Sequence, residues 1–180
     1  MAPNSGIAPE ILDDTEMSAE EGRDMTKRFE GWDSNPYKDT KGNPTIGYGF
    51  NISEYEGLIP KDVLSGTRGL TQEEGNFIFE QAYRIAGEDA ERYLGDTYDK
   101  LALGVTDIIT DMSYNMGYPK LSGFKKLKKA LQEDDYAKAA AEMKDSKWYG
   151  QVGNRSKELV EKMKGFKKEA PDTLTDEEIE

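Results

Sequence analysis

The sequence contains no cysteine and no histidine among its 180 residues. Without cysteine, the chain can form neither a disulfide bond nor a thiolate metal site. Without histidine, it lacks the most frequent metal ligand and the most frequent general base of enzymes. We therefore expect no metal and no cofactor, and we expect carboxylates, tyrosines or lysines to carry any acid–base chemistry.

Long apolar runs are also missing. No stretch approaches the roughly 20 apolar residues that a membrane-spanning helix needs, and the first residues show neither the basic segment nor the apolar core of a secretion signal. We expect no membrane insertion and no export by a signal in this sequence. The length and the hydrophobic content of 36% suit one domain or two small lobes with a buried core.

Positive charge is scarce overall and unevenly distributed. The formal net charge is −12, yet residues 120–168 carry 14 Lys and Arg against 7 Asp and Glu. Such an acidic chain is a poor candidate for nucleic-acid binding. The basic segment is either a solvated surface or a local contact for an anionic polymer, and the sequence leaves both interpretations open.

The pattern before residue 95 predicts two helices and one small sheet. Capping boxes that begin at Ser18 and Thr71 each start a helix, and the second helix extends to about Leu94, which is long enough to join two lobes. Between them, turn residues separate two short strand-like runs in residues 35–50, which is typical of a β-hairpin. Residues 1–17 and 169–180 lack periodicity, and we expect a flexible N-terminal extension and an acidic C-terminal tail.

The pattern after residue 95 is helical. Apolar residues at three- and four-residue steps predict a central buried helix from Leu101 to Met116, and shorter helices follow near 125–131, 136–144 and 155–163, the last with Asn154 as its N-cap. The expected class is α+β and mostly helical. It has a small N-terminal lobe with a β-hairpin sheet (about 18–70), a connecting helix (about 71–94) and a helical C-terminal lobe (about 95–168).

Three residues around the hairpin form a candidate catalytic site. Glu30 lies at a predicted helix C-terminus, Asp39 at the end of the first strand and Thr45 across the turn, so their side chains can meet at one cleft edge. Glycoside hydrolysis uses a protonated carboxyl group and a second carboxylate. The partial negative charge of a helix C-terminus disfavours the ionised form of Glu30. The pair alone is weak evidence, because 36 of 180 residues are acidic.

The order of the residues around this pair is more specific. Glu30-Gly31 is followed by Tyr37-Lys38-Asp39-Thr40 and by Thr45-Ile46-Gly47-Tyr48-Gly49. This string resembles the T4-type phage lysozymes, glycoside hydrolase family 24. A second stretch is similar to the same family and comprises Asn115-Met116-Gly117, Gly123-Phe124, Ser146-Lys147-Trp148-Tyr149, Gln151 and Asn154-Arg155. The resemblance covers about residues 18–166 in unchanged order.

This resemblance implies a lysozyme-like fold and an N-acetylmuramidase that cleaves the β-1,4 bond between N-acetylmuramic acid and N-acetylglucosamine in peptidoglycan. It also implies that Glu30 is the general acid, that Asp39 positions or activates the attacking water and that Thr45 holds this water, which gives an inverting reaction. Arg155 is expected beside the acid, where it lowers the pKa of Glu30 and opposes the effect of the helix end, so the net direction stays open.

Aromatic and amide groups suit a cleft that stacks on and hydrogen-bonds to sugar rings, and the expected substrate-binding residues are Tyr37, Asn115, Gln151 and Arg155. For Trp148 we favour a place in the core over sugar stacking. Gly47 and Gly49 are expected to permit close backbone approach beside the cleft.

Two other functions remain open. One is a lysozyme-fold binding or structural module of a virion, and the other is a lytic transglycosylase, which needs no water-holding Asp and Thr. As a lysozyme, the protein is expected to be a monomer that acts on bacterial peptidoglycan during phage lysis or entry. It would wait in the host cytoplasm for a holin to release it to the cell wall or periplasm, or it would be carried by the virion.

Overall fold

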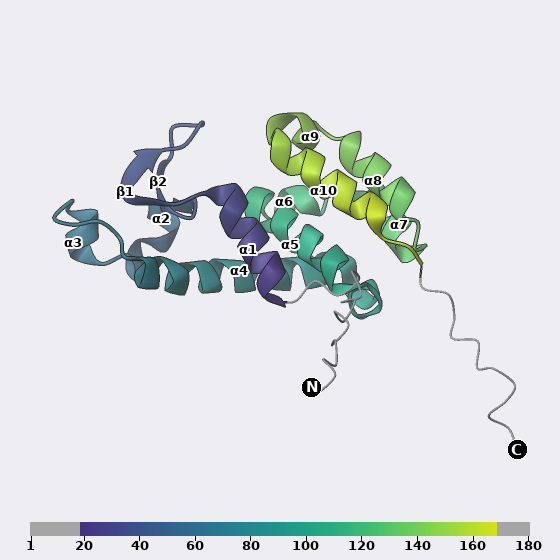
Figure 1. Ribbon diagram of the computed structural model, residues 1–180, viewed down its shortest axis with the longest axis horizontal. Coiled ribbons are helices and arrows are strands. Elements are labelled where there is room, and N and C mark those ends of the chain that lie inside the picture. Colours follow the sequence, from purple (N-terminus) through teal and green to yellow (C-terminus); the bar gives the residue numbers. More distant parts are fainter. Residues whose placement is uncertain (1–18, 169–180) are drawn as a thin grey trace, which may run out of the picture.

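A computed structural model describes residues 19–168 and has a mostly helical α+β fold, as the sequence predicted (Figure 1). The predicted cap Ser18, the N-terminal extension and the C-terminal tail lie outside the described residues. The longer helices are α1 (Ala19–Glu30), α4 (Gln72–Leu94), α5 (Leu103–Met116), α7 (Lys125–Gln132), α8 (Tyr136–Lys144) and α10 (Asn154–Gly165). The short ones are α2 (Ile52–Tyr55), α3 (Lys61–Leu64), α6 (Tyr118–Leu121) and α9 (Lys147–Gln151), with 3-10 helices η1 (Glu56–Leu58) and η2 (Gly95–Lys100).

The sheet has three antiparallel strands in the order β1-β2-β3. The strands are β1 (Asp33–Lys38), β2 (Pro44–Gly47) and β3 (Phe50–Asn51). Strands β1 and β2 form the predicted hairpin, in which Tyr37 pairs with Thr45. The short strand β3 was not predicted, and it pairs Asn51 with Thr45 on the other side. Thr45 therefore lies in the central strand of the sheet.

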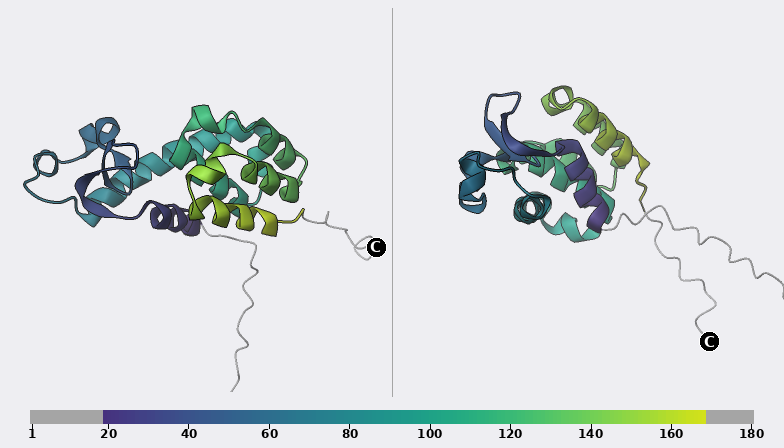
Figure 2. Two further views of the ribbon diagram at one scale, coloured as in Figure 1. Left: turned by 90° about the horizontal axis from the view of Figure 1, so that it is seen from above. Right: turned by 60° about the vertical axis from the view of Figure 1, so that its left-hand side comes forward.

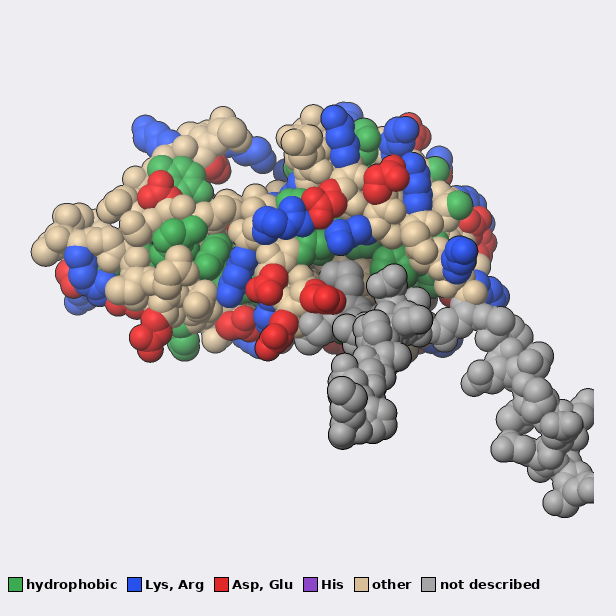
Figure 3. Space-filling view, in the orientation of Figure 1, with side chains coloured by type: hydrophobic (Ala, Val, Ile, Leu, Met, Phe, Trp, Pro, Cys, Tyr) green, Lys and Arg blue, Asp and Glu red, His purple; other side chains and the backbone are tan. Residues whose placement is uncertain are grey.

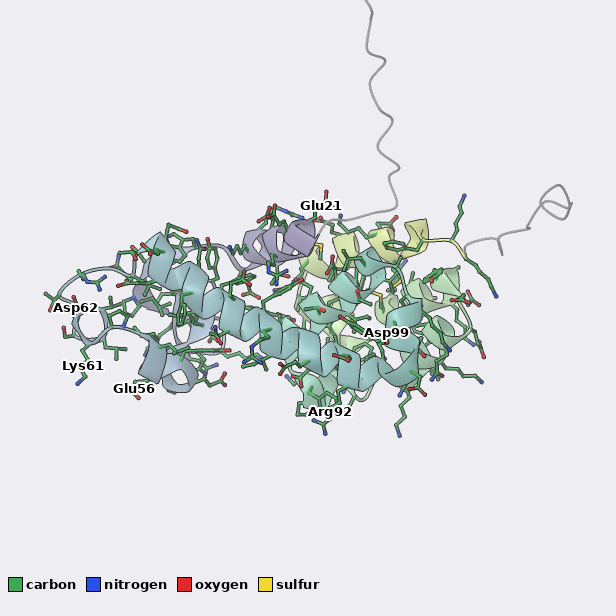
Figure 4. The ribbon with its side chains drawn as sticks, turned by 90° about the horizontal axis from the view of Figure 1, so that it is seen from below. Glu21, Glu56, Lys61, Asp62, Arg92 and Asp99 are labelled. Atoms are coloured by element: carbon green, nitrogen blue, oxygen red, sulfur yellow. The ribbon has the colours of Figure 1, made fainter. Side chains whose placement is uncertain are left out.

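The long helix α4 begins at the predicted capping box. The Thr71 hydroxyl accepts a hydrogen bond from the Glu74 backbone N–H (3.2 Å), and the Glu74 carboxylate accepts one from the Thr71 N–H (3.0 Å). The helix runs under both halves of the molecule, as the view from above shows (Figure 2). From below, Asp62 lies at one end of the molecule and Arg92 and Asp99 lie towards the other end of α4 (Figure 4).

Two separate hydrophobic clusters share α4. The smaller cluster packs the sheet and α3 against the first half of α4 and contains Ile46, Phe50, Ile59, Val63, Leu70, Ile78, Phe79 and Tyr83. The larger cluster surrounds the central helix α5, in which Val105, Ile108, Ile109 and Met112 are fully buried. Met25 of α1 is part of the larger cluster, so the helix that carries Glu30 packs with the helical lobe rather than with the sheet.

Besides strand β3, two local features differ from the sequence prediction. Asn154 was predicted as the N-cap of the last long helix, but it is the first helical residue and Gly153 is the cap, without a side-chain hydrogen bond. Gly153 has a φ of 59°, which glycine tolerates, and it turns the chain directly into α10. The short helices α2, α3, α6 and α9 were not predicted, because helices of four or five residues carry too little periodicity to detect. Within residues 19–168, none of the helices has the length and apolar character needed to cross a membrane.

Candidate active site

Glu30 is the last residue of α1. Gly31 follows with a φ of 71°, and its N–H donates to the Lys27 carbonyl (3.0 Å), which ends the helix. A positive φ is a conformation that glycine adopts without strain. The Glu30 side chain is only 16% exposed, because it turns towards α5 and α10 instead of extending into solvent.

A hydrogen-bonded network connects Glu30 to two other helices. Arg155 of α10 donates from Nη1 to Glu30 Oε1 (2.7 Å), from Nε to Asp111 Oδ2 (2.9 Å) and from Nη2 to Asp111 Oδ1 (3.0 Å). The Thr26 hydroxyl of α1 also donates to Asp111 Oδ1 (2.7 Å). We call Thr26, Glu30, Asp111 and Arg155 the junction network. Asp111 is fully buried and Arg155 is 8% exposed, so the network is nearly closed to water.

The environment of Glu30 raises the pKa of its carboxyl group above the ordinary value of 4.5. Burial is the largest cause, because it penalises the charged form. The charge and hydrogen bond of Arg155 lower the pKa, and the negative charge of Asp111 raises it. The sequence left the net direction open, and the structure gives a carboxyl group that holds its proton to higher pH than an exposed glutamate does.

Gly49 makes room for the Glu30 side chain. It lies in the turn between β2 and β3 with a φ of 77°, and a Cβ atom at this position would overlap Glu30 Oε2. The expected close backbone approach is therefore confirmed for Gly49, whereas Gly47 faces the ring of Phe50 in the smaller cluster. The same turn is held against α5, since the Tyr114 hydroxyl donates to the Tyr48 carbonyl (3.0 Å).

Asp39 lies just after β1, in the hairpin turn. Its Oδ1 accepts hydrogen bonds from the backbone N–H groups of Lys41 (2.9 Å) and Asn43 (2.8 Å), and its Oδ2 accepts one from Asn43 Nδ2 (3.1 Å). These bonds, chiefly those from Asn43, lower the pKa of Asp39 below its ordinary value. A carboxylate oxygen accepts about two hydrogen bonds, so Oδ2 has capacity left for a water molecule.

Thr45 and Tyr37 face each other across the first strand pair. Thr45 is 4% exposed, and its hydroxyl donates to the Asn43 carbonyl (2.9 Å), which leaves the lone pairs of its oxygen free to accept. Burial raises the pKa of Tyr37, and the charges of Glu30 and two aspartates raise it further. Tyr37 is thus close enough to Glu30 to sense its charge.

A groove of about 1120 Å³ opens between the hairpin turn and the helical lobe (Figure 3). Thr40 and Lys41 line it on the hairpin side, and Asn115, Trp148 and Gln151 line it on the other. The Trp148 Nε1–H donates to Asn115 Oδ1 (3.1 Å), and Trp148 is 5% exposed within the larger cluster, which confirms its expected place in the core.

The predicted site residues thus divide into two groups. Asn115 and Gln151 line the groove, whereas the other predicted residues do not, namely Glu30, Tyr37, Asp39, Thr45 and Arg155. The guanidinium of Arg155, a predicted substrate-binding residue, is hydrogen-bonded to Glu30 and Asp111. Within residues 19–168 no group of three or more His, Cys, Asp or Glu side chains is arranged to hold a metal ion.

The sequence model of the family described as phage lysozyme matches residues 27–165. The chain belongs to the phage lysozyme family. The matched segment contains Glu30, Asp39, Thr45 and the remote Arg155, so it spans both the hairpin and the last helix of the site. As a member of this family the protein is a glycosidase, and its substrate is peptidoglycan.

Individual phage lysozyme relatives agree with this assignment. Probable T4-type lysozymes 2 and 1 of Dictyostelium discoideum are each 31% identical over 153 residues, which is 77% of this chain and 90% of each relative. The pre-baseplate central spike protein Gp5 of Enterobacteria phage T4 is 26% identical over 151 residues, which is 76% of this chain and 26% of Gp5.

Sequence reasoning missed two members of the junction network, Thr26 and Asp111. Asp111 lies in the apolar series that predicted α5, and it is 0% exposed. A carboxylate almost never occupies such a position without a partner, so an aspartate inside an apolar helix pattern was the available signal. For Thr26 the sequence held no comparable signal.

Proposed function

We propose that this lysozyme is an N-acetylmuramidase that hydrolyses the β-1,4 bond between N-acetylmuramic acid and N-acetylglucosamine with inversion of the anomeric carbon. Glu30 acts as the general acid. Asp39 and Thr45 hold and activate the attacking water on the opposite face of the sugar.

The observation that supports these roles is the opposite tuning of two carboxyl groups. Burial raises the pKa of Glu30, whereas hydrogen bonds within the hairpin turn lower the pKa of Asp39. Two carboxyl groups whose environments move their pKa values apart are suited to act as proton donor and as ionised partner in one reaction. Glu30 therefore has the role of the donor and Asp39 that of the carboxylate.

The proposed reaction is a single displacement. Glu30 gives its proton to the glycosidic oxygen as the bond from this oxygen to the anomeric carbon breaks. A water molecule, hydrogen-bonded to Asp39 Oδ2 and to the Thr45 oxygen, forms the new bond to this carbon and releases a proton to Asp39. Tyr37 beside the acid, and Asn115 and Gln151 in the groove, provide hydrogen-bonding groups for the glycan and its substituents.

Product analysis tests the proposal directly. Purified peptidoglycan is digested, and the new ends are identified by mass spectrometry. We expect reducing N-acetylmuramic acid ends. Anhydro ends would identify a lytic transglycosylase instead, and the absence of released fragments would identify a binding module.

The stereochemistry is tested on a soluble peptidoglycan oligomer. Proton NMR recorded during the first turnovers should detect the α-anomer before mutarotation, because a held water attacks opposite the leaving group. Detection of the β-anomer first would exclude the role given to Asp39 and Thr45.

A place in a virion is a second candidate, favoured by the similarity to Gp5, whose name describes a baseplate spike. We propose lysis after release by a holin as the first possibility and delivery by the particle as the second. Mass spectrometry of purified particles separates them, since a carried enzyme is present at a fixed number of copies per particle and a released enzyme is absent.

A further inference from the structure

The junction network contains one cation and two carboxyl groups. Arg155 is hydrogen-bonded to Glu30 through one nitrogen and to Asp111 through two. Asp111 is 0% exposed, and Thr26 donates a third hydrogen bond to it. The positive charge of Arg155 is therefore shared between the proposed catalytic acid and a second carboxylate that is fully buried and that the proposed reaction does not use.

This sharing bears on a conflict in the site. A guanidinium 2.7 Å from a carboxylate stabilises the ionised form strongly, and most strongly where water is excluded. A general acid must instead hold its proton until the leaving oxygen takes it. An arginine that only paired with Glu30 would position the acid and weaken it at the same time.

We propose that Asp111 is a positioning residue that neutralises Arg155, so that Arg155 holds the Glu30 carboxyl group in place without keeping it ionised. The inference rests on the proposed role of Glu30 as general acid. Asp111 touches no substrate in this scheme and acts through Arg155. The hydrogen bond from Thr26 fixes the side chain of Asp111, which then has partners on α1 and α10.

The other groups around Glu30 do not supply this neutralisation. Tyr37 from β1 and Tyr114 from α5 feel the charge of Glu30, and burial raises the pKa of each, so both are uncharged at neutral pH. Arg28 from α1 also feels the charge of Asp111 but uses its guanidinium nitrogens on Glu158. Among the groups that act on Glu30, Asp111 is the one that carries a negative charge.

Helix α5 offers a matched control one turn earlier. Asp107 is also buried, at 6% exposure, and it packs closely against Gly22 of α1. The groups that act on Asp107 are Arg23, Glu21 and Tyr83, and Asp107 is not among the groups that act on Glu30. Replacing either aspartate by asparagine removes one buried carboxyl group from the same helix, but only Asp111 is hydrogen-bonded to Arg155.

The experiment measures Glu30 itself. In wild type, Asp111→Asn and Asp107→Asn, the carboxyl carbon of Glu30 is followed by ¹³C NMR as the pH is changed, and kcat/KM is measured over the same range. Asparagine keeps the size of Asp111 and one acceptor oxygen. Asp111→Ser, a second neutral variant with space for a water, is used if Asp111→Asn does not fold, as judged by circular dichroism.

We expect the Glu30 carboxyl to titrate above 4.5 in wild type. In the neutral variants of Asp111 its midpoint should fall by about one pH unit, and the alkaline limb of kcat/KM should move down with it. Activity on the acidic side should stay within about two-fold of wild type, since the proton is then present in both proteins. Asp107→Asn should leave the midpoint of Glu30 unchanged.

Three results would overturn the proposal. They are a wild-type midpoint below 4.5, an unchanged midpoint in the neutral variants of Asp111, and an equal loss of activity at every pH. The last result is the one that a purely structural role predicts. The NMR titration does not require activity, so an inactive wild-type protein would refute the proposed function and still leave the electrostatic role of Asp111 open to this measurement.

Discussion

The hairpin turn and the junction network each hold one of the two carboxyl groups of the proposed reaction, by different means. Asp39 is held by donors within four residues of it in the chain. Glu30 is held by Arg155, 125 residues away. Local backbone donors favour a carboxylate at the surface, whereas burial between distant helices favours a carboxylic acid. Disturbing the two regions separately should therefore give different results.

Loss of the acidic proton at the junction should have the largest effect. Glu30→Gln keeps the size of the side chain and an acceptor for Arg155, but an amide donates no proton to the leaving oxygen. We expect wall clearing to fall by about 10³-fold with an unchanged melting temperature. Glu158→Gln, which removes an acid from the exposed pair with Arg28, is the control. More than a tenth of wild-type activity in Glu30→Gln would exclude Glu30 as the acid.

Changes in the hairpin should cost activity without affecting the junction. Asp39→Asn removes the charge that accepts the water's proton, and we expect a loss of about 10²-fold in the rate of wall clearing. Thr45→Glu places a carboxylate where the water is held and should inactivate to a similar extent. In Asp39→Asn the Glu30 carboxyl should titrate as in wild type, because Asp39 is not among the groups that act on it. Normal clearing by both would show that the acid acts without these residues.

Gly49, in the turn between β2 and β3, lies against Glu30 of the junction network, so a substitution there should disturb the acid directly. In Gly49→Ala the new methyl group displaces Glu30 Oε2, and alanine is strained at a φ of 77°. We expect roughly a 10- to 100-fold loss of activity and destabilisation by about 2 kcal/mol. Gly66→Ala is the control, because Gly66 has a φ of 76° and nothing within 4 Å of the added Cβ. It should lose stability and keep its activity, and equal losses of activity would refute the steric role of Gly49.

The buried Asp107 predicts a pH-dependent difference in stability between wild type and Asp107→Asn. Burial is the largest cause that raises the pKa of Asp107 to about 6, from 3.8. The native state therefore binds this proton more tightly than the unfolded state, so the stability that the proton contributes is full below pH 3.8 and is lost as the pH rises through 6. Asp107→Asn should be more stable than wild type at pH 7.5, by at most about 3 kcal/mol, and no more stable at pH 3.5.

Thermal unfolding at both pH values measures this difference. A constant difference between the two proteins would contradict the buried titration of Asp107.

The smallest expected effect concerns the approach to the wall. The chain carries a net charge of −12, while the groove is lined by Lys41, Lys120, Lys125, Lys126 and Lys147 against Glu142 and Asp145. Repulsion of the whole molecule from an anionic wall acts over about 30 Å at 0.01 M salt and about 10 Å at 0.1 M. The rate of wall clearing should rise a few-fold between these concentrations and fall again at higher salt.

Two variants distinguish the contribution of the lysines from that of the acidic residues. Charge reversal at Lys125, Lys126, Lys128 and Lys129 should deepen the low-salt penalty, and removal of residues 169–180 should relieve it. A rate that only falls as salt is added would show that the acidic surface does not face the wall.

The sequence predicted what is encoded locally. Thr71 and Glu74 form their capping box within one turn, and Asp39 and Thr45 belong to one hairpin, in which Thr45 pairs with Tyr37. The pairing of Arg155 with Glu30 was implied by resemblance alone. Asp111 was missed because its partners lie 85 and 44 residues away and no local pattern specifies them. The prediction of Asn154 as the N-cap was wrong, because Gly153 takes the cap position with a positive φ. Residue composition does not reveal this backbone conformation.

The position of Arg155 near the end of the folded region has a consequence for synthesis. Residues emerge from the ribosome in order, so α1, the sheet, α4 and α5 are complete before α10 exists. Until then, Glu30 and Asp111 are two carboxyl groups without their shared cation, and the burial of Asp111 is unfavourable. Glu30 therefore reaches its final environment only after α10 has been translated and has docked. A chain truncated before Asn154 should be inactive.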